Sequence, residues 1–318
     1  MDDVIQTCSR VVDSAQFVSL DHDAIRNFAN ILSAEDLAKT ELTNELAELN
    51  EEQRITFILV FESICYSFWG EPKWTTIVDG IAADGSRAMT RALLQAIANG
   101  YDILSADYLQ HISNKDFAII LDGNVTIPLF DARLAMLRAL GTYITTSYNR
   151  SFIAFFDDTS WDAPTIVRKL IHDLPLIFDD STKYHGKSVY FYKRAQLVPA
   201  KLHDLSQLGL ISQSVRNVEQ LTGFADYKVP QLLRRLGIVR YVSELAEKID
   251  TYTELSSGSD EEIEIRAATI IALQHITSQA QQHIPTATAA KVDSALFLAT
   301  QEKPLNNTPY HRSRTIWY

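Results

Sequence analysis

The apolar residues of this chain recur mainly at intervals of three and four positions, which is the spacing of a helix with one buried face. The longest example begins at Ser259, where Ser259 and Glu262 have the spacing of a capping box, and continues through His275. Its expected buried face consists of Ile263, Ala267, Ile270, Leu273 and Ile276. No parallel-sheet pattern, glycine-rich phosphate loop, heptad or internal repeat competes with this periodicity. The sequence therefore predicts an all-α fold, with residues 1–318 forming a single compact multi-helix domain.

Helical spacing also predicts most of the remaining elements. The expected helices cover residues 21–28, 34–49, 55–68, 86–98, 128–148, 165–172, 189–205, 230–236 and 289–301, with short helical pieces beginning at 107 and 115. Residues 151–156 could pass for a strand, but no preceding stretch alternates in the same way, so we interpret them as helical core. The tail, residues 308–318, is rich in aromatic and basic side chains, and we expect it to fold back onto the body.

The composition is that of an ordinary globular protein. Of the 318 residues, 46% are apolar and 22% are charged, and the mean hydropathy is −0.07. The longest apolar run, residues 55–69, is interrupted by Glu62 and Ser63 and is too short to span a bilayer. The first residues, Met-Asp-Asp-Val, lack the basic and apolar regions of a secretory signal. We therefore expect no membrane association and a cytoplasmic location.

The cysteine and acidic residues predict neither a disulfide framework nor a metal site. Cys8 and Cys65 are the two cysteines, and no Cys/His cluster with zinc spacing is present, so both are expected to be free thiols. Asp157 and Asp158 are adjacent, but no further ligands cluster nearby in sequence, which favours a solvated loop over a cation site. No metal and no cofactor are expected.

The formal net charge of −11 limits the classes of partner. A protein that binds a long nucleic acid directly needs a broad basic surface to neutralise phosphates, so the charge argues against such a partner. A local basic pocket for one phosphate is compatible with it. The cations considered for that pocket are Lys193, Arg194, Lys228, Arg240, Arg312 and Arg314.

Residues 221–237 place one carboxylate at the mouth of a short amphipathic helix. Pro230 suits the first helical position and disfavours helical geometry in the residue before it, so we expect the helix to begin at Pro230. Asp226 would then lie on a loop outside the N-cap. The expected buried face of the helix is Leu232, Leu233 and Leu236. The alternative for Asp226 is an Asx-turn that only leads the chain into the helix.

Within this stretch, residues 224–231 (Phe-Ala-Asp-Tyr-Lys-Val-Pro-Gln) resemble the signature of the queuosine salvage proteins, the queuosine 5′-phosphate N-glycosylase/hydrolases. Four further segments match that family in the same order. They are 66–74 (Tyr-Ser-Phe-Trp-Gly-Glu-Pro-Lys-Trp), 191–196 (Phe-Tyr-Lys-Arg-Ala-Gln), 258–267 (Gly-Ser-Asp-Glu-Glu-Ile-Glu-Ile-Arg-Ala) and 310–318 (Tyr-His-Arg-Ser-Arg-Thr-Ile-Trp-Tyr). The resemblance implies an all-α fold distantly similar to that of helix-hairpin-helix DNA glycosylases. It also implies hydrolysis of the N-glycosidic bond of queuosine 5′-phosphate, which releases queuine for reuse in tRNA modification.

This reaction gives a reason for a carboxylate on a loop. Breaking a C–N glycosidic bond creates an oxocarbenium-like ribosyl centre, and a carboxylate beside C1′ can stabilise it, form a covalent adduct with it or deprotonate the attacking water. Asp226 is the catalytic candidate, with all three roles open. Lys193 is the second candidate, because a lysine there could position the acid or assist the leaving base. The alternative for Lys193 is a structural ion pair with Asp226.

The resemblance also implies contacts to the substrate, a modified nucleoside 5′-monophosphate. Queuine has a carbon where guanine carries N7, so help for the leaving group must come from elsewhere, for example from the edge of the six-membered ring. By motif position, Phe224 would stack on the base and backbone groups at Gly223 would read its edge. Tyr227 and Arg194 are further substrate-binding candidates, and Arg194 is one of the cations considered for the phosphate, with the choice among them open.

The cyclopentenediol of the base needs a carboxylate or amide pair. Asn44, Glu62 and Gln301 are the candidates. The chain departs from the family pattern at Asn44, Glu62, Cys65 and residues 296–299. These departures bear on the preference for a particular base or diol more than on the type of reaction.

Two other functions are compatible with the sequence. The first is a non-catalytic protein that binds a modified 7-deazaguanine nucleoside, and the presence of both Asp226 and Lys193 counts against it. The second is a glycosylase that acts on a related deazapurine nucleotide or on a base within a nucleic acid. The charge of −11 counts against a nucleic-acid substrate, since even a base-flipping enzyme must hold the flanking phosphates.

Overall fold

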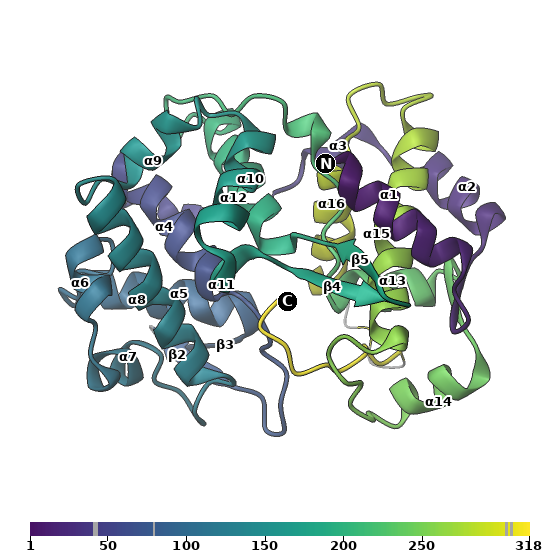
Figure 1. Cartoon of the computed structure of the whole chain (residues 1–318), viewed down its shortest axis with the longest axis horizontal. Coiled ribbons are helices and arrows are strands. Elements are labelled where there is room, and N and C mark those ends of the chain that lie inside the picture. Colours follow the sequence, from purple (N-terminus) through teal and green to yellow (C-terminus); the bar gives the residue numbers. More distant parts are fainter. Residues whose placement is uncertain (41–43, 79, 303–304, 306–307) are drawn as a thin grey trace.

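The computed structural model of this chain describes residues 1–40, 44–78, 80–302, 305 and 308–318. The side chains of Asn44, Val78 and Glu302 lie outside that description. Figure 1 shows the arrangement of the elements along the chain.

Helices make up most of the described residues. The α-helices are α1 (Asp2–Asp13), α2 (His22–Ile31), α3 (Ala34–Ala38), α4 (Glu51–Ile64), α5 (Gly85–Ala98), α6 (Ala106–His111), α7 (Asn114–Ile120), α8 (Phe130–Ser147), α9 (Phe152–Asp158), α10 (Ala163–Asp173), α11 (Pro175–Phe178), α12 (Lys193–Gln207), α13 (Lys228–Arg235), α14 (Ser243–Asp250), α15 (Asp260–Ala280) and α16 (Ala289–Glu302). The 3-10 helices are η1 (Asn44–Leu46) and η2 (Val218–Gln220). The prediction of a mostly helical, single compact domain is confirmed. Among the described helices, none is both long and apolar enough to cross a bilayer.

Among the described residues, six short strands are present that the all-α prediction missed. They pair as three antiparallel sheets: β1 (Val18–Leu20) with β6 (Val239–Tyr241), β2 (Thr75–Val78) with β3 (Ile81–Asp84), and β4 (Ser181–Tyr184) with β5 (Lys187–Tyr190). Strands of three or four residues are too short for an alternating pattern to stand out. The turn between β4 and β5 is formed by His185 and Gly186, whose φ angles of 48° and 78° match the two-residue turn that hairpins favour.

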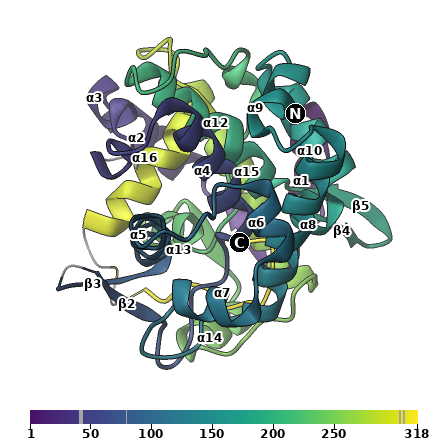
Figure 2. The ribbon, with the colours of Figure 1, turned by 90° about the vertical axis from the view of Figure 1, so that its left-hand side faces the viewer.

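Helix α15 lies between two hydrophobic clusters and contributes buried residues to both. Every residue from Glu262 to Leu273 is buried. Ile263 and Ile270 belong to the larger cluster, with residues of α4, α8 and α12, whereas Ile265 and Leu273 belong to the smaller one, with residues of α2, α13 and α16. A helix that is buried on all sides is expected in the interior of a domain, and Figure 2 shows α15 among these neighbours.

The C-terminal tail folds back onto the body, as predicted, and its end lies near the centre in both views (Figure 1 and Figure 2). Trp69 Nε1 donates to the carbonyl of Ser313 (3.1 Å), and the N–H of Ser67 donates to the carbonyl of Tyr318 (2.8 Å). The side chain of Tyr318 is buried. The tail is therefore part of the core.

The helix that follows Asp226 begins earlier than predicted. Helix α13 starts at Lys228, and Pro230 occupies its third position. The first N–H groups of any helix lack an intrahelical partner, so proline is tolerated throughout the first turn. The predicted buried face is correct at Leu232 and Leu233 but wrong at Leu236, which is 38% exposed.

Two other local predictions have opposite outcomes. Helix α12 begins at Lys193 rather than at residue 189, because residues 187–190 form strand β5. Residues 152–156 are helical, as interpreted, and lie in α9, with Ser151 as its N-cap. Cys8 and Cys65 are both buried, and neither forms a disulfide with a described residue, in agreement with the prediction.

Candidate active site

A cavity lies where the loop before α13, the helices α4, α12 and α16, the start of α5 and the C-terminal tail meet. Its carboxylates are Glu62, Asp84, Asp204, Asp226 and Asp293. Its cations are Lys73, Lys193, Lys201 and Lys228. Its aromatic side chains are Tyr66, Phe68, Trp69, Phe224, Tyr227, Phe297, Tyr310 and Tyr318. Aromatic walls with a few converging charged groups are typical of sites for small polar ligands.

Asp226 lies directly before the N-cap of α13 and lines this cavity. Its Oδ1 accepts hydrogen bonds from the N–H groups of Lys228 (2.9 Å) and Val229 (2.8 Å), and no described residue donates to Oδ2. Oδ1 therefore forms the Asx-turn that was the alternative for Asp226, while Oδ2 remains available to a ligand. Burial raises the pKa of the Asp226 carboxyl, and the positive charge of Lys193 and the two N–H donors act in the opposite direction.

Lys193 is the first residue of α12, and its side chain lines the cavity. Its backbone N–H donates to Asp180 Oδ2 (3.3 Å), which holds the start of the helix. Within the described residues, no carboxylate forms an ion pair with Lys193 Nζ. The structure therefore brings Lys193 and Asp226 to one cavity without the structural ion pair that was the alternative for Lys193.

Glu62 is fully buried in α4 and faces Lys201 of α12. Lys201 Nζ lies 2.7 Å from Glu62 Oε1, and Glu62 Oε2 has no hydrogen-bond partner in the part of the chain that the structure describes. A buried carboxylate oxygen without a donor is costly, so a ligand that donates to Oε2 would be favoured. Sequence reasoning missed Lys201. The signal was its spacing of two helical turns from Lys193 on one face of α12.

Phe224 and Tyr227 line the cavity as predicted, whereas Gly223 does not. The N–H of Phe224 donates to Asp293 Oδ1 of α16 (2.8 Å), which holds the loop to α16. At Gly223, an added Cβ would lie 2.2 Å from Leu273 Cδ1. The structure therefore assigns Gly223 to the close packing of the loop against α15, and the prediction that its backbone reads the base edge needs correction.

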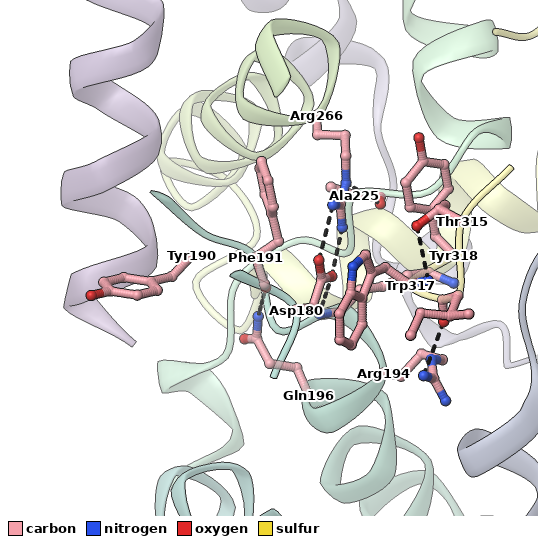
Figure 3. A network of polar contacts seen from close by, with 12 residues as sticks. Asp180, Tyr190, Phe191, Arg194, Gln196, Ala225, Arg266, Thr315, Trp317 and Tyr318 are labelled. Atoms are coloured by element: carbon pink, nitrogen blue, oxygen red, sulfur yellow. Dashed lines mark hydrogen bonds and ion pairs between the residues drawn. The ribbon is translucent and has the colours of Figure 1, made fainter. Parts of the chain in front are cut away.

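The arginines that were candidates for phosphate binding are engaged elsewhere. Arg194 is 1% exposed, and its guanidinium donates to four carbonyls, those of Glu62, Ser63, Ile177 and Ile316. Figure 3 shows it beside the C-terminal tail. The structure therefore does not bring Arg194, a candidate for substrate binding, to the cavity, because its guanidinium links α4, α11 and the tail.

Arg312, Arg314 and Arg240 are also absent from the cavity lining. Arg314 lies 3.6 Å from the centre of the Trp69 ring and donates to the Trp69 carbonyl (3.0 Å). Arg312 pairs with Glu71 at 2.6 Å. Among the predicted cations besides Lys193, Lys228 reaches the cavity, and the unpredicted Lys73 joins it there.

Gln301 and Asn44 differ in what the structure shows of them. Gln301 is exposed and lies at the edge of the cavity, in keeping with a substrate-binding role. The side chain of Asn44 lies outside the described residues, so its assignment stays a prediction. Cys65 lines the same cavity.

The acidic pair at the end of α9 has local partners. Asp157 accepts from Trp161 Nε1 (2.9 Å), and Asp158 lies 3.1 Å from Lys169 Nζ. In the part of the chain that the structure describes, no group of three or more His, Cys, Asp or Glu side chains could hold a metal ion.

Comparison with known proteins decides the family. The sequence model described as "Queuosine salvage protein" matches residues 46–318. The chain belongs to the queuosine salvage protein family. A relative from Sphaerobacter thermophilus is 35% identical and aligns over 99% of this chain and 97% of its own length. Relatives from Mus musculus (26% identical, 97% and 96%) and Schizosaccharomyces pombe (25%, 84% and 85%) are more distant. All three are named queuosine 5′-phosphate N-glycosylase/hydrolase.

The five segments that resemble the queuosine salvage proteins gather around the cavity. Segments 66–74, 191–196, 224–231 and 310–318 all contribute lining residues. Segment 258–267 lies behind the wall, where Arg266 Nε donates to the carbonyl of Ala225 (3.4 Å). The family resemblance therefore coincides with one site in the fold.

Proposed function

We propose that this chain hydrolyses the N-glycosidic bond of queuosine 5′-phosphate and releases queuine. The names of its relatives support this activity. The observation that carries it is the arrangement of Asp226, with one oxygen held by two backbone N–H groups and the other available in the cavity beside the Lys193 side chain.

In the proposed reaction, Asp226 Oδ2 faces C1′ of the ribose. The bond between C1′ and the base nitrogen breaks, the hydroxyl of water adds to C1′, and a proton goes to the departing base. The carboxylate can act as electrostatic stabiliser, nucleophile or base. Its two fixed hydrogen bonds orient it before the substrate arrives, which avoids reorganisation in the transition state. Lys193 supplies a positive charge and N–H donors to the same cavity.

The substrate contacts follow from the charges of the cavity. Glu62 Oε2 and Gln301 are the proposed acceptors for the hydroxyl-bearing end of the base, with Asn44 as a further candidate. Phe224 and Tyr227 offer aromatic surfaces to the base.

Lys228, which is one of the predicted cations, and Lys73 are the proposed ligands of the 5′-phosphate. Lys228 Nζ lies 4.7 Å from the centre of the Tyr310 ring, and Lys73 Nζ lies 3.3 Å from Asp84 Oδ2. Burial and the nearby charge of Lys73 lower the pKa of Lys228. A bound phosphate would offset the repulsion between the two cations.

Three further expectations belong to this proposal. They are the distant likeness of the fold to helix-hairpin-helix DNA glycosylases, a cytoplasmic location and the absence of a long nucleic acid as a direct partner. The net charge of −11 supports the last of these.

The test is to incubate the purified protein with queuosine 5′-phosphate and to follow queuine and ribose 5-phosphate by liquid chromatography and mass spectrometry. We expect equal amounts of the two products, and release by the Asp226→Asn variant that is slower by roughly 10²- to 10³-fold. Binding of the nucleotide without any release by the wild-type protein would refute the proposal and favour a non-catalytic binding protein.

A further inference from the structure

A buried ion pair lies directly behind the two proposed catalytic residues. Arg266 of α15 donates from both terminal nitrogens to Asp180, at 2.9 Å to Oδ1 and 2.6 Å to Oδ2. Asp180 is 3% exposed and Arg266 is 2% exposed. Figure 3 shows the guanidinium of Arg266 above the carboxylate of Asp180. The fork of an arginine and the two oxygens of a carboxylate fix each other in one plane, which a single hydrogen bond does not do.

Each member of this pair also holds the backbone next to one proposed catalytic residue. Arg266 Nε donates to the carbonyl of Ala225, the residue before Asp226 (3.4 Å). Asp180 Oδ2 accepts from the backbone N–H of Lys193 (3.3 Å). A continuous chain of contacts therefore runs from the Asp226 loop through the ion pair to the first residue of α12.

The same aspartate stabilises the turn that leads into α12. The carbonyl of Asp180 accepts from the N–H groups of Phe191 (3.0 Å) and Tyr192 (3.3 Å). Tyr192 has a φ of 52°, in the left-handed region that is unfavourable for a residue with a side chain. Contacts from Asp180 thus support a backbone conformation that the turn would not readily adopt alone.

Aromatic rings restrict the arginine on its other sides. The guanidinium carbon of Arg266 lies 3.9 Å from the centre of the Phe191 ring and 4.5 Å from that of Tyr318. Tyr318 in turn donates from its hydroxyl to Glu262 Oε1 (2.8 Å). Arg266 therefore has little freedom to reorient without disturbing either the α12 turn or the C-terminal tail.

We propose that Asp180 and Arg266 are positioning residues that set the separation between Lys193 and Asp226 in the proposed glycosylase site. The inference rests on the proposed function. Neither side chain lines the cavity, so both act through the backbone segments that they hold. A displacement of about 1 Å between reacting groups can lower a rate by about 100-fold, so loss of the Asp180–Arg266 pair should lower kcat measurably.

A purely structural role predicts a different result from a positioning role. Loss of a structural ion pair lowers the fraction of folded protein but leaves each folded molecule fully active. Loss of a positioning pair lowers kcat per folded molecule with little change in KM, because the substrate contacts are elsewhere in the cavity.

The pH profile offers a second distinction. The charged groups that share the cavity with Asp226 are Lys73, Lys193, Lys201, Lys228, Glu62, Asp84, Asp204 and Asp293. Of these, the charge of Lys193 is the strongest influence that lowers the pKa of Asp226. If the Asp180–Arg266 pair held the two backbone segments less rigidly, Lys193 and Asp226 would move apart. The pKa of Asp226 would then rise, so the acidic limb of the pH profile of kcat would move to higher pH. Arg266→Lys suits this measurement because it keeps the positive charge and removes the fork.

The experiment compares Asp180→Asn, Arg266→Lys and the double variant Asp180→Asn/Arg266→Gln with the wild-type enzyme on queuosine 5′-phosphate. Removing one partner of a buried pair is strongly destabilising, whereas neutralising both is better tolerated, so the double variant decides if Asp180→Asn fails to fold. Glu262 Oε1 also lies 3.7 Å from Arg266 Nη1, so Arg266→Lys, which keeps a positive charge beside Glu262, decides if the double variant fails to fold. Asp173→Asn is the matched control, because Asp173 pairs with Lys169 (3.0 Å) at the end of α10 and does not line the cavity. Activity is expressed per folded molecule, with folding measured by circular dichroism below each melting temperature.

We expect kcat of the pair variants to fall by about 10- to 100-fold with KM within about threefold of wild type, and the acidic limb of Arg266→Lys to move to higher pH. The control should have a lower melting temperature and wild-type kcat. If the folded pair variants keep wild-type kcat and pH profile while Asp226→Asn is inactive, the positioning role is refuted and the proposed function stands. If wild-type protein releases no queuine, the proposed function fails and the positioning role fails with it.

Discussion

Replacing Asp226 with asparagine should make the protein more stable and nearly inactive at the same time. Oδ1 of Asp226 accepts from the N–H groups of Lys228 and Val229, and the amide oxygen of asparagine can accept the same two bonds. The substitution therefore keeps the cap of α13 and removes a charge from a side chain that is 7% exposed. The two consequences of that lost charge, for turnover and for folding, can be measured separately.

Turnover should fall because the transition state loses the negative charge that faces C1′. Removing one preorganised electrostatic contact costs about 3–4 kcal/mol, which corresponds to roughly 10²- to 10³-fold in kcat. The shape of the site is preserved, so KM for queuosine 5′-phosphate should change by less than about threefold.

Stability should change in the opposite direction. Burial raises the pKa of Asp226, and this effect exceeds the lowering by Lys193 and by the two N–H donors. An acid whose pKa is raised by folding binds its proton more tightly in the native state than in the unfolded one. Stability is therefore lost as the pH rises from the unfolded pKa of about 3.9 through the folded value, by about 1.4 kcal/mol for each unit of difference. Asparagine avoids this loss at neutral pH.

Urea unfolding at pH 7.5 and at pH 5 measures this effect. We expect a higher midpoint for Asp226→Asn at pH 7.5 and a difference from wild type that shrinks as the pH falls towards 4. Asp226→Ala is the control, because it removes the charge and also the cap, whose loss costs about 1 kcal/mol. An asparagine variant that is less stable than wild type at pH 7.5 would refute the reasoning, since the charge would then be net favourable in its folded surroundings.

Three further predictions concern packing, the phosphate and metal ions. Gly223→Ala should cost about 1–3 kcal/mol, because the new Cβ would lie 2.2 Å from Leu273 Cδ1 and 3.0 Å from Leu273 Cβ; an unchanged melting temperature would contradict this. Lys73→Gln and Lys228→Gln should each lower kcat/KM for queuosine 5′-phosphate by about 10- to 100-fold and leave kcat/KM for queuosine unchanged; equal losses on both substrates would place the phosphate elsewhere. Hydrolysis should survive EDTA, and a loss restored by one divalent ion would overturn the metal-free mechanism.

Part of the site could be located from sequence because its residues lie in short motifs. Asp226, Phe224 and Tyr227 fall within one stretch of eight residues, and the structure places all three at the cavity. Lys193 was found in the same way. Lys201 was missed because it lies beyond the matching segment, and its importance becomes visible only when α12 packs beside Glu62.

The presence of an arginine or lysine in a family motif did not by itself predict whether its side chain reaches the cavity. Arg194 directly follows Lys193, yet successive residues of a helix point about 100° apart, so one enters the cavity wall and the other turns into the core. There Arg194 donates to carbonyls of α4 and of the C-terminal tail, more than 120 residues away in either direction. No local pattern records such partners.

The sequence by itself determined the helical class, most helix positions and the family motifs, because hydrophobic periodicity and capping depend on neighbours within a few residues. Only the tertiary structure decided which charged side chains face the cavity and which support the backbone behind it. Asp180 and Arg266 are 86 residues apart, and their pairing depends on the packing of α15 against the turn before α12. Burial then makes such a long-range partner decisive, since a charge removed from water is stable only where the fold supplies its counterpart.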